Sequence, residues 1–217
     1  MAYQLNLHHL DLAYSGGAFE GKWPRRFVPQ HAGNLDIADG QLAASDPLVE
    51  PEPLPFTQSV PNGSFPVTLA IGVLENGDER VAYARVDFSS AKPVRWEMAL
   101  VGGQDHRELE ADSFFGYGVD AGTGCFMGVA ASRDLARAMD KVEDYFESII
   151  DGMDATYKHT RSWYAWKPDT AGSENIVCFS SGYGDGCYPS FFGYDAAGNA
   201  VALVTDFLTL SDPEQED

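Results

Sequence analysis

The chain has 217 residues, of which 14 are Lys or Arg and 33 are Asp or Glu, so its formal net charge at pH 7 is −19. This length suits one domain with a sizeable hydrophobic core. The negative charge would repel a nucleic-acid backbone or an anionic membrane surface, so we expect no nucleic-acid and no membrane partner.

The cysteines and the first residues favour a cytoplasmic protein. No stretch approaches the length of a transmembrane helix, and the N-terminal residues lack the basic start and apolar run of a secretory signal. Cys125, Cys178 and Cys187 lack the number and spacing of a disulfide framework or a zinc site. We therefore expect reduced thiols and a cytoplasmic location. A bridge between Cys178 and Cys187 across a hairpin stays geometrically open.

The first third of the chain contains few regular patterns. Residues 1–33 are expected to form an irregular N-terminal arm. Two short strands are predicted around Asp39-Gly40, a residue pair typical of hairpin turns. The prolines of residues 50–55 (EPEPLP) do not suit a helix or a central strand and predict an extended connection.

Strands and turns alternate in the next part of the chain. Residues 65–74, 80–88 and 94–101 show the period of two that is typical of β-strands. A turn containing Asn76-Gly77 separates the first two. This pattern predicts an antiparallel meander with one buried face.

A single long helix is predicted over residues 132–151, because apolar side chains recur every three or four positions from Leu135 onward. Ser132 is the expected N-cap and Gly152 the expected stop.

The expected fold is one α+β domain over residues 34–210. It is mainly antiparallel β-sheet, built as a sandwich or a partly open barrel with the long helix packed on it. More strands follow the helix, and residues 211–217 are expected to form an acidic tail.

Residues 115–128 (FGYGVDAGTGCFMG) contain a glycine-rich turn. Gly122, Thr123 and Gly124 are candidates for presenting N–H groups to a ligand, and Asp120 and Cys125 are catalytic candidates. The alternative is a structural turn in which Asp120 bonds local N–H groups. Phosphate is disfavoured, because no Lys or Arg lies within seven residues of Asp120 and no Walker pattern is present.

A second glycine-rich loop, residues 180–189 (SSGYGDGCYP), places the catalytic candidate Asp185 between two glycines. The alternative is a long hairpin loop stabilised by an Asx-type turn. Both loops follow predicted strands, so we expect residues 118–125 and 182–188 to lie side by side. The candidate ligand-binding residues of the second loop are Tyr183, Gly184, Gly186 and Tyr188.

Asp206 shares the apolar face of the last predicted strand with Val204 and Leu208. A buried carboxylate needs hydrogen-bond donors, or its pKa rises. We expect a buried side chain that accepts hydrogen bonds, and the alternative is a catalytic acid in a cleft. The five histidines have no metal-ligand spacing, so neither a metal site nor a cofactor is expected.

Taken together, the motifs of residues 35–210 resemble an uncharacterised bacterial family, the domain-of-unknown-function family numbered 4241. The strongest blocks are residues 118–125 and 184–188. The family pattern often has an acid just after the CFM run, where this chain has Gly128. The resemblance implies a soluble bacterial protein and no particular reaction.

Two functional hypotheses follow. The first is a non-catalytic binding or interaction module in bacterial conflict or regulation, with a protein or small-molecule partner. It rests on the acidic charge and on the lack of a complete catalytic constellation in the sequence. The second is a hydrolase or metal-dependent enzyme that uses Asp120, Asp185 and Asp206. Three carboxylates that converge in one pocket would favour the enzyme, and separately capped turns would favour the module.

Overall fold

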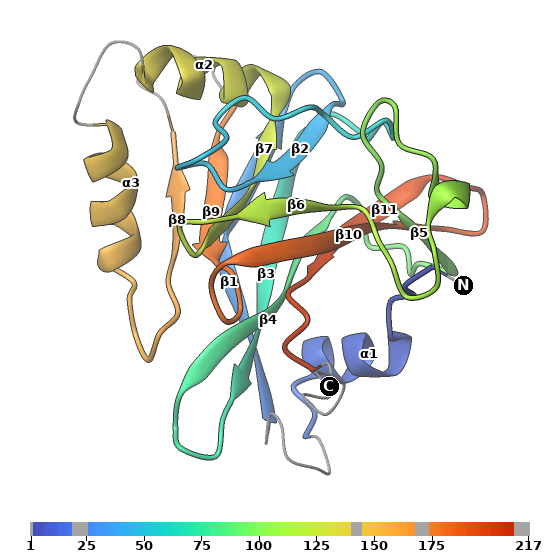
Figure 1. Cartoon of the computed structure of the whole chain (residues 1–217), viewed down its shortest axis with the longest axis horizontal. Helices are drawn as coiled ribbons and strands as arrows, with labels where there is room; N and C mark the ends of the chain where they lie inside the picture. Colours follow the sequence, from blue (N-terminus) through green and yellow to red (C-terminus); the bar gives the residue numbers. More distant parts are fainter. Residues whose placement is uncertain (1, 19–25, 140–144, 168–173, 211–217) are drawn as a thin grey trace.

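The computed structural model describes residues 2–18, 26–139, 145–167 and 174–210. In this part of the chain two antiparallel sheets pack against each other without closing into a barrel, and helices lie on both outer sides (Figure 1). The predicted α+β, sandwich-like fold is therefore confirmed.

The larger sheet has seven strands within the described residues. Its order is β1 (Arg26–Ile37), β3 (Gly63–Val73), β4 (Glu79–Asp87), β11 (Ala200–Asp206), β10 (Gly186–Tyr194) and β5 (Arg95–Met98), with β6 (Gly116–Val119) also on β10. β5 pairs with residues 191–194 of β10 and β6 pairs with residues 186–189, so these two short strands follow one another along β10.

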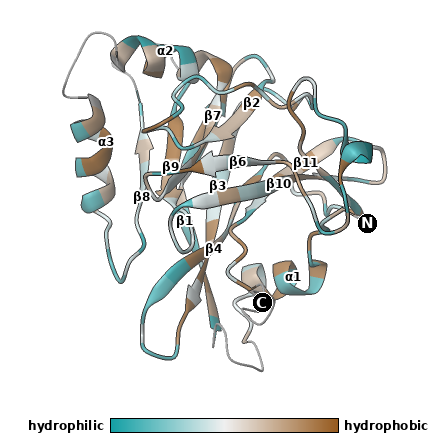
Figure 2. Cartoon of the chain, viewed as in Figure 1, coloured by the Kyte–Doolittle hydropathy of each residue, from teal (hydrophilic) through white to brown (hydrophobic). Residues whose placement is uncertain are grey.

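The smaller sheet supplies the other wall of the main core. Its order, again within the described residues, is β2 (Leu42–Ser45), β7 (Thr123–Gly128), β9 (Ile176–Ser180) and β8 (Trp163–Trp166). Leu35 and Leu203 of the larger sheet are buried in one cluster with Phe126 and Phe179 of the smaller sheet. Figure 2 shows apolar residues concentrated on these strands and polar residues in the hairpin between β3 and β4.

Each sheet has a second apolar face that a helix covers. α1 (Leu7–Ser15) buries Leu10 and Ala13 in a cluster with residues of the larger sheet. α2 (Val129–Met139) and α3 (Tyr145–Asp154) bury Leu135 and Ile149 against the smaller sheet. A short 3₁₀ helix, η1 (His106–Glu108), lies in the connection from β5 to β6. None of these helices has the length and hydrophobicity needed to span a bilayer.

The prediction of one long helix over residues 132–151 is wrong, because α2 and α3 are separate helices with different directions (Figure 1). Ser132 lies inside α2, where its hydroxyl donates to the carbonyl of Val129 at 2.8 Å. Gly152 lies inside α3 and does not end it. A Cβ atom there would lie 2.4 Å from the ring of Tyr164, so this glycine allows α3 to pack closely on β8.

Three further expectations need correction. Residues 1–33 are not an irregular arm, because they contain α1 and the beginning of β1. The strands on either side of Asp39-Gly40 do not form a hairpin, because β1 pairs with β3 and β2 pairs with β7. The meander ends at β4, since β11 pairs with β4 and β5 pairs with β10. The expected acidic tail, residues 211–217, lies outside the described residues.

Candidate functional site

The glycine-rich turn after β6 is held by a carboxylate from elsewhere in the chain. The N–H groups of Asp120 and Ala121 donate to Oδ2 of Asp46 at 3.0 and 2.7 Å. Oδ1 of Asp46 accepts from the N–H of Leu48 at 3.0 Å, and the side chain is fully buried. An internal anion therefore occupies the N–H groups that a phosphate would need, and the geometry favours a structural turn.

The glycines of this turn have different roles. Gly122 has a φ of +64°, a conformation that favours glycine. A Cβ at Gly124 would lie 2.7 Å from the hydroxyl of Tyr117, so glycine is required there by packing. A Cβ at Gly118 would meet no atom within 4 Å, and the φ of Gly118 is not positive. Neither backbone conformation nor crowding requires glycine at residue 118.

The two glycine-rich segments lie side by side, as predicted. β6 pairs with β10 from Val119–Gly186 to Gly116–Pro189. The N–H of Ser181 donates to the carbonyl of Gly122 at 3.1 Å. These contacts join the first residues of one segment to the last residues of the other and hold Gly122 beside the start of the second loop.

The second loop is stabilised mainly by hydroxyl groups. The hydroxyls of Tyr188 and Ser181 donate to the carbonyl of Gly184 at 2.8 and 2.9 Å. Asp185 and Gly186 are exposed, and the guanidinium of Arg80 lies 5.4 Å from the exposed ring of Tyr183. Of the other candidate ligand-binding residues, Thr123, Gly124 and Tyr188 are buried.

Asp206 is buried and accepts two hydrogen bonds, as predicted. Its carboxylate accepts from the hydroxyl of Tyr3 and from the N–H of Leu208, both at 2.8 Å. Burial raises the pKa of Asp206 to about 6, although both hydrogen bonds oppose this shift. The carboxylate faces a cavity of about 220 Å³ that is also lined by Tyr3, His9 and Tyr83.

The three aspartates do not form a common centre. Asp120 and Asp185 are exposed in neighbouring loops, whereas Asp206 is bonded to the N-terminal segment. Among the described residues, no group of three His, Cys, Asp or Glu side chains is arranged to hold a metal ion. The geometry therefore does not support an enzyme built from these three carboxylates.

The cysteines are free thiols, and the bridge between Cys178 and Cys187 is not formed. Cys125 and Cys178 are paired across β7 and β9 and are fully buried, whereas Cys187 is exposed. Burial raises the pKa of Cys125 to about 12. At neutral pH Cys125 is a protonated, inaccessible thiol, so the geometry gives no support to its role as a nucleophile.

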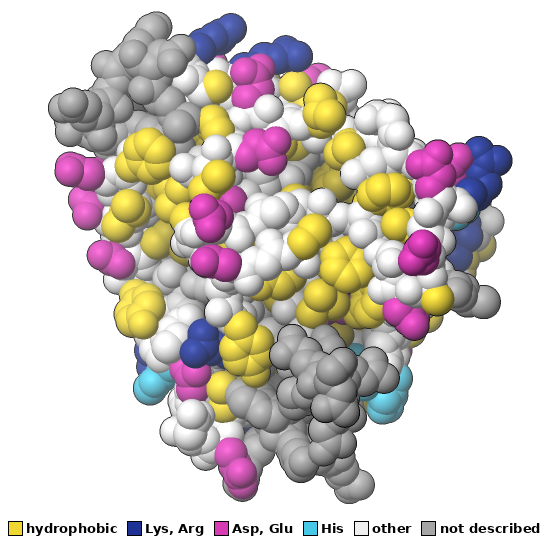
Figure 3. All heavy atoms as spheres, in the orientation of Figure 1, with side chains coloured by type: hydrophobic (Ala, Val, Ile, Leu, Met, Phe, Trp, Pro, Cys, Tyr) yellow, Lys and Arg dark blue, Asp and Glu magenta, His cyan; other side chains and the backbone are white. Residues whose placement is uncertain are grey.

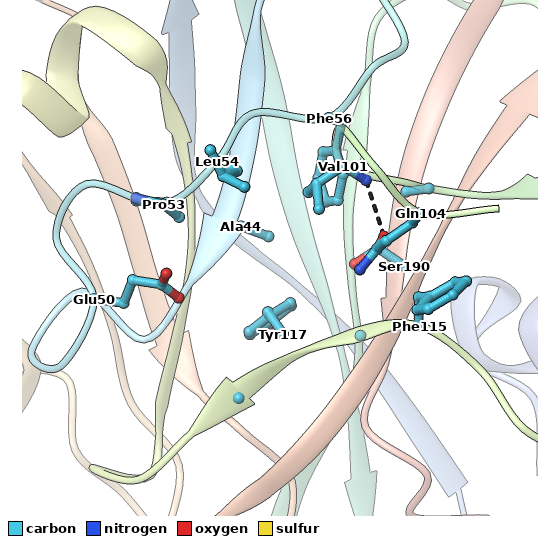
Figure 4. A pocket seen from close by; sticks show the side chains of 13 residues that line it. Ala44, Glu50, Pro53, Leu54, Phe56, Val101, Gln104, Phe115, Tyr117 and Ser190 are labelled. Carbon is cyan, nitrogen blue, oxygen red and sulfur yellow. Dashed lines mark hydrogen bonds between the residues drawn. The ribbon is translucent and has the colours of Figure 1, made fainter.

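A cavity of about 210 Å³ lies at the junction between β5 and β6, which pair with successive parts of β10 (Figure 4). β6 and Ser190 form one side, and the loop of residues 50–56 forms the opposite side (Figure 4). Phe56 forms a bridge with Val101, and its N–H donates to the carbonyl of Leu42 at 2.9 Å, so this loop is held on both sides. The lining side chains are Ala44, Glu50, Pro53, Leu54, Phe56, Ala99, Val101, Gln104, Phe115, Tyr117 and Ser190.

Polar side chains lie at defined positions in this cavity. The side-chain oxygen of Gln104 accepts from the N–H of Val101 at 3.0 Å, which fixes the amide (Figure 4). The Glu50 carboxylate points from the loop toward Tyr117 (Figure 4). Leu54 is 64% exposed and lies in the same loop. None of these residues was predicted as a site residue, because the lining of the cavity comes from five separate segments of the chain.

The main-chain N–H and C=O groups of Gly116 and Gly118 in β6 form no ladder hydrogen bonds with β10, as the register of the two strands indicates. Neighbouring pairs in an antiparallel ladder alternate between hydrogen-bonded and non-hydrogen-bonded. The pair Gly116–Pro189 is non-hydrogen-bonded, because Pro189 has no N–H to exchange. The pair Gly118–Cys187 lies two positions further and is therefore non-hydrogen-bonded as well.

A hydrogen bond at the end of β6 agrees with this register. The N–H of Asp120 points away from β10 and donates to Asp46, and groups two residues apart in a strand point to the same side. The N–H and C=O groups of Gly116 and Gly118 consequently face the free edge of β6. Within the described residues β10 is the strand that pairs with β6, and both glycines line the cavity.

Comparison with known proteins places this architecture in a family. Residues 35–205 match the family described as "Protein of unknown function (DUF4241)", a range that includes α2, α3 and the strands of both sheets except residues 26–34 of β1 and the last residue of β11. No curated protein and no solved structure matches the chain. The match includes β6, the Asp46 turn and every residue that lines the cavity. The chain therefore belongs to the DUF4241 family, whose members are of unknown function.

Proposed function

We propose that the protein is a non-catalytic binding module and that its ligand site is the cavity between β6 and the loop of residues 50–56. The observation that carries the proposal is Gly118. This residue has an ordinary φ and open space around its missing side chain, and its main-chain groups face the cavity. A glycine with no structural reason is typical of a place where a ligand approaches the backbone closely.

The cavity chemistry supports binding rather than catalysis. Its lining combines apolar side chains with polar groups, among them a fixed amide at Gln104 and one carboxylate at Glu50. A cavity that combines apolar side chains with a few convergent polar groups is typical of ligand sites. The acids proposed for catalysis, Asp120, Asp185 and Asp206, do not line this cavity.

The charge of the site narrows the ligand class. Glu50 in the cavity and the net charge of −19 disfavour an anion, so the ligand is neutral or cationic. We extend the proposal to a cytoplasmic protein, because free thiols at Cys125, Cys178 and Cys187 suit a reducing compartment. We also propose that the ligand is part of another protein and that binding serves bacterial regulation or conflict.

The test is a titration of the ¹⁵N-labelled protein with a set of small amides, amines and carboxylic acids. We expect saturable shifts of the Gly116 and Gly118 amide signals with amides or amines. Gly118→Val fills the open space and should abolish these shifts. Gly102→Val is the matched control, because Gly102 also has an ordinary φ and open surroundings but does not line the cavity.

Two results would overturn the proposal. One is the absence of any saturable shift at Gly116 and Gly118 across the set. The other is binding that Gly118→Val and Gly102→Val leave equally intact, which would place the ligand elsewhere. Chemical conversion of a bound compound by the wild-type protein, lost in Asp206→Asn, would favour the enzyme.

A further inference from the structure

We infer that the ligand is an extended peptide segment that adds to the free edge of β6 and places a Lys or Arg side chain near Glu50. This inference rests on the proposed function and names its partner class. In this binding mode main-chain hydrogen bonds provide affinity, and pockets for alternate side chains provide specificity.

The free edge offers the groups that strand addition needs. By this register Gly116 and Gly118 each direct one N–H and one C=O away from β10, and both residues line the cavity. Both glycines are exposed, whereas Tyr117 and Val119 between and beside them are buried in the core. The exposed face of β6 therefore carries no side chain that would keep a peptide backbone at a distance.

The length of the binding strand is limited at one end. At Asp120 and Ala121 the outward N–H groups are already taken by the buried Asp46 carboxylate. Strand addition is therefore confined to the four residues of β6, Gly116–Val119. Groups on alternate residues of so short a strand match about three residues of a partner.

Apolar side chains lie where alternate residues of such a peptide would point. Leu54, Phe56, Val101 and Phe115 line the cavity beside the free edge. Leu54 of the loop is 64% exposed, and Val49, which directly precedes the loop, is 54% exposed. In Figure 3 hydrophobic side chains gather on this face of the molecule. One apolar peptide residue would cover surface that is now in contact with water.

Charge favours a basic residue next to that apolar one. Glu50 lines the cavity, and Asp120 and Asp185 are exposed beyond the C-terminal end of β6. Figure 3 shows acidic side chains at several places on this face. With 33 acidic and 14 basic residues in the chain, a cationic peptide is attracted over longer distances as well.

The experiment uses the acetylated and amidated peptide Val-Lys-Val-Lys-Val and ¹⁵N-labelled protein. Two further versions carry N-methyl groups, one on both lysines and the other on all three valines. A strand bound by one edge uses the N–H groups of alternate residues, so one methylated version should bind about tenfold or more weakly than the other. The Val-Glu-Val-Glu-Val peptide should bind at least as weakly as the weaker of the two methylated versions, because the acidic site repels its carboxylates.

Two protein variants complete the design. Gly118→Pro removes an N–H that the β6–β10 ladder does not use. The variant should therefore keep its fold and bind Val-Lys-Val-Lys-Val about tenfold more weakly than the wild type. If this variant unfolds, Glu50→Gln serves instead. This variant should bind Val-Lys-Val-Lys-Val more weakly than the wild type does, and its affinity for the neutral Val-Ser-Val-Ser-Val peptide should be unchanged.

The outcomes separate this inference from the proposed function. If small amides shift the Gly118 signal and no peptide does, the cavity is a ligand site and the peptide inference is wrong. The inference is also wrong if both methylated peptides bind equally, or if Glu50→Gln affects the lysine and serine peptides alike. If neither small compounds nor peptides move the Gly118 signal, the proposed function fails as well.

Discussion

Replacing Asp206 by asparagine tests the energetic cost of a buried carboxylate. Asp206 is 3% exposed, and its pKa is raised from 3.8 to about 6 in the folded protein. A carboxyl group with a raised pKa favours the protonated form of the folded state, so it lowers stability as pH rises through the interval from 3.8 to 6. The shift of about two pKa units corresponds to about 3 kcal/mol at pH 7.

An asparagine side chain at this position keeps the shape of the aspartate and cannot ionise. Its carbonyl oxygen can still accept from the N–H of Leu208, and its amide can donate to the Tyr3 hydroxyl. We expect the free energy of unfolding of Asp206→Asn, relative to wild type, to rise by about 2 kcal/mol between pH 4 and pH 7, because the unfolded chain is already partly ionised at pH 4. Asp206→Ala, compared at pH 5, should instead destabilise by about 1–3 kcal/mol, because both donors lose their acceptor.

The assay is urea unfolding of the wild type and the asparagine variant at pH 4, 5, 6 and 7 at constant ionic strength. Other titrating groups are shared, so the difference between the two proteins isolates Asp206. A difference that stays constant over this range would show that the carboxyl group titrates normally, and the argument from burial would be wrong. An unchanged thermal midpoint in Asp206→Ala would contradict the hydrogen bonds to Tyr3 and Leu208.

The other predictions concern the turn, its packing and the thiols. Asp46→Ala should lower the free energy of unfolding by about 3 kcal/mol, because three N–H groups lose their acceptor, whereas the exposed Asp120→Ala should cost about 0.5 kcal/mol or less in urea unfolding. Gly124→Ala should cost about 1–3 kcal/mol, and adding Tyr117→Phe should recover much of it, since the clash is with the Tyr117 hydroxyl; a purely additive double variant would disprove the contact. In the native protein a thiol reagent should label Cys187 rapidly, and fast labelling of a second cysteine, detected by mass spectrometry, would contradict the burial of the other two.

The sequence was informative about local structure and about segments that are near in the chain. Alternation predicted the strands β3 and β4 and their antiparallel pairing, because a short turn at Asn76-Gly77 joins them. It did not predict that β11 pairs with β4, because this contact joins residues more than 110 positions apart. An apolar stripe also cannot distinguish one long helix from two shorter ones on the same sheet, which explains the error over α2 and α3.

The candidate site was predicted only in part. The two glycine-rich segments were expected to be neighbours, because each follows a predicted strand. The pairing of β6 with β10 confirms this prediction. Asp46 was missed because it lies 74 residues before the turn that it caps. Its only local signal is the sequence Ser-Asp-Pro, which is common in ordinary turns. Glu50 and Gln104 carry no motif at all, and only the folded chain brings them to one cavity.

The position of β11 has a consequence for synthesis of the chain. β4 is a central strand of the finished sheet, but its neighbour β11 is the last of the described strands to leave the ribosome. Until then the nascent sheet ends at β4, whose residues 81–84 are apolar and whose outer edge is unpaired. Such an edge is a template for pairing with other chains. We therefore expect a chain interrupted before residue 200 to aggregate through β4, because pairing with β11 is what covers this edge.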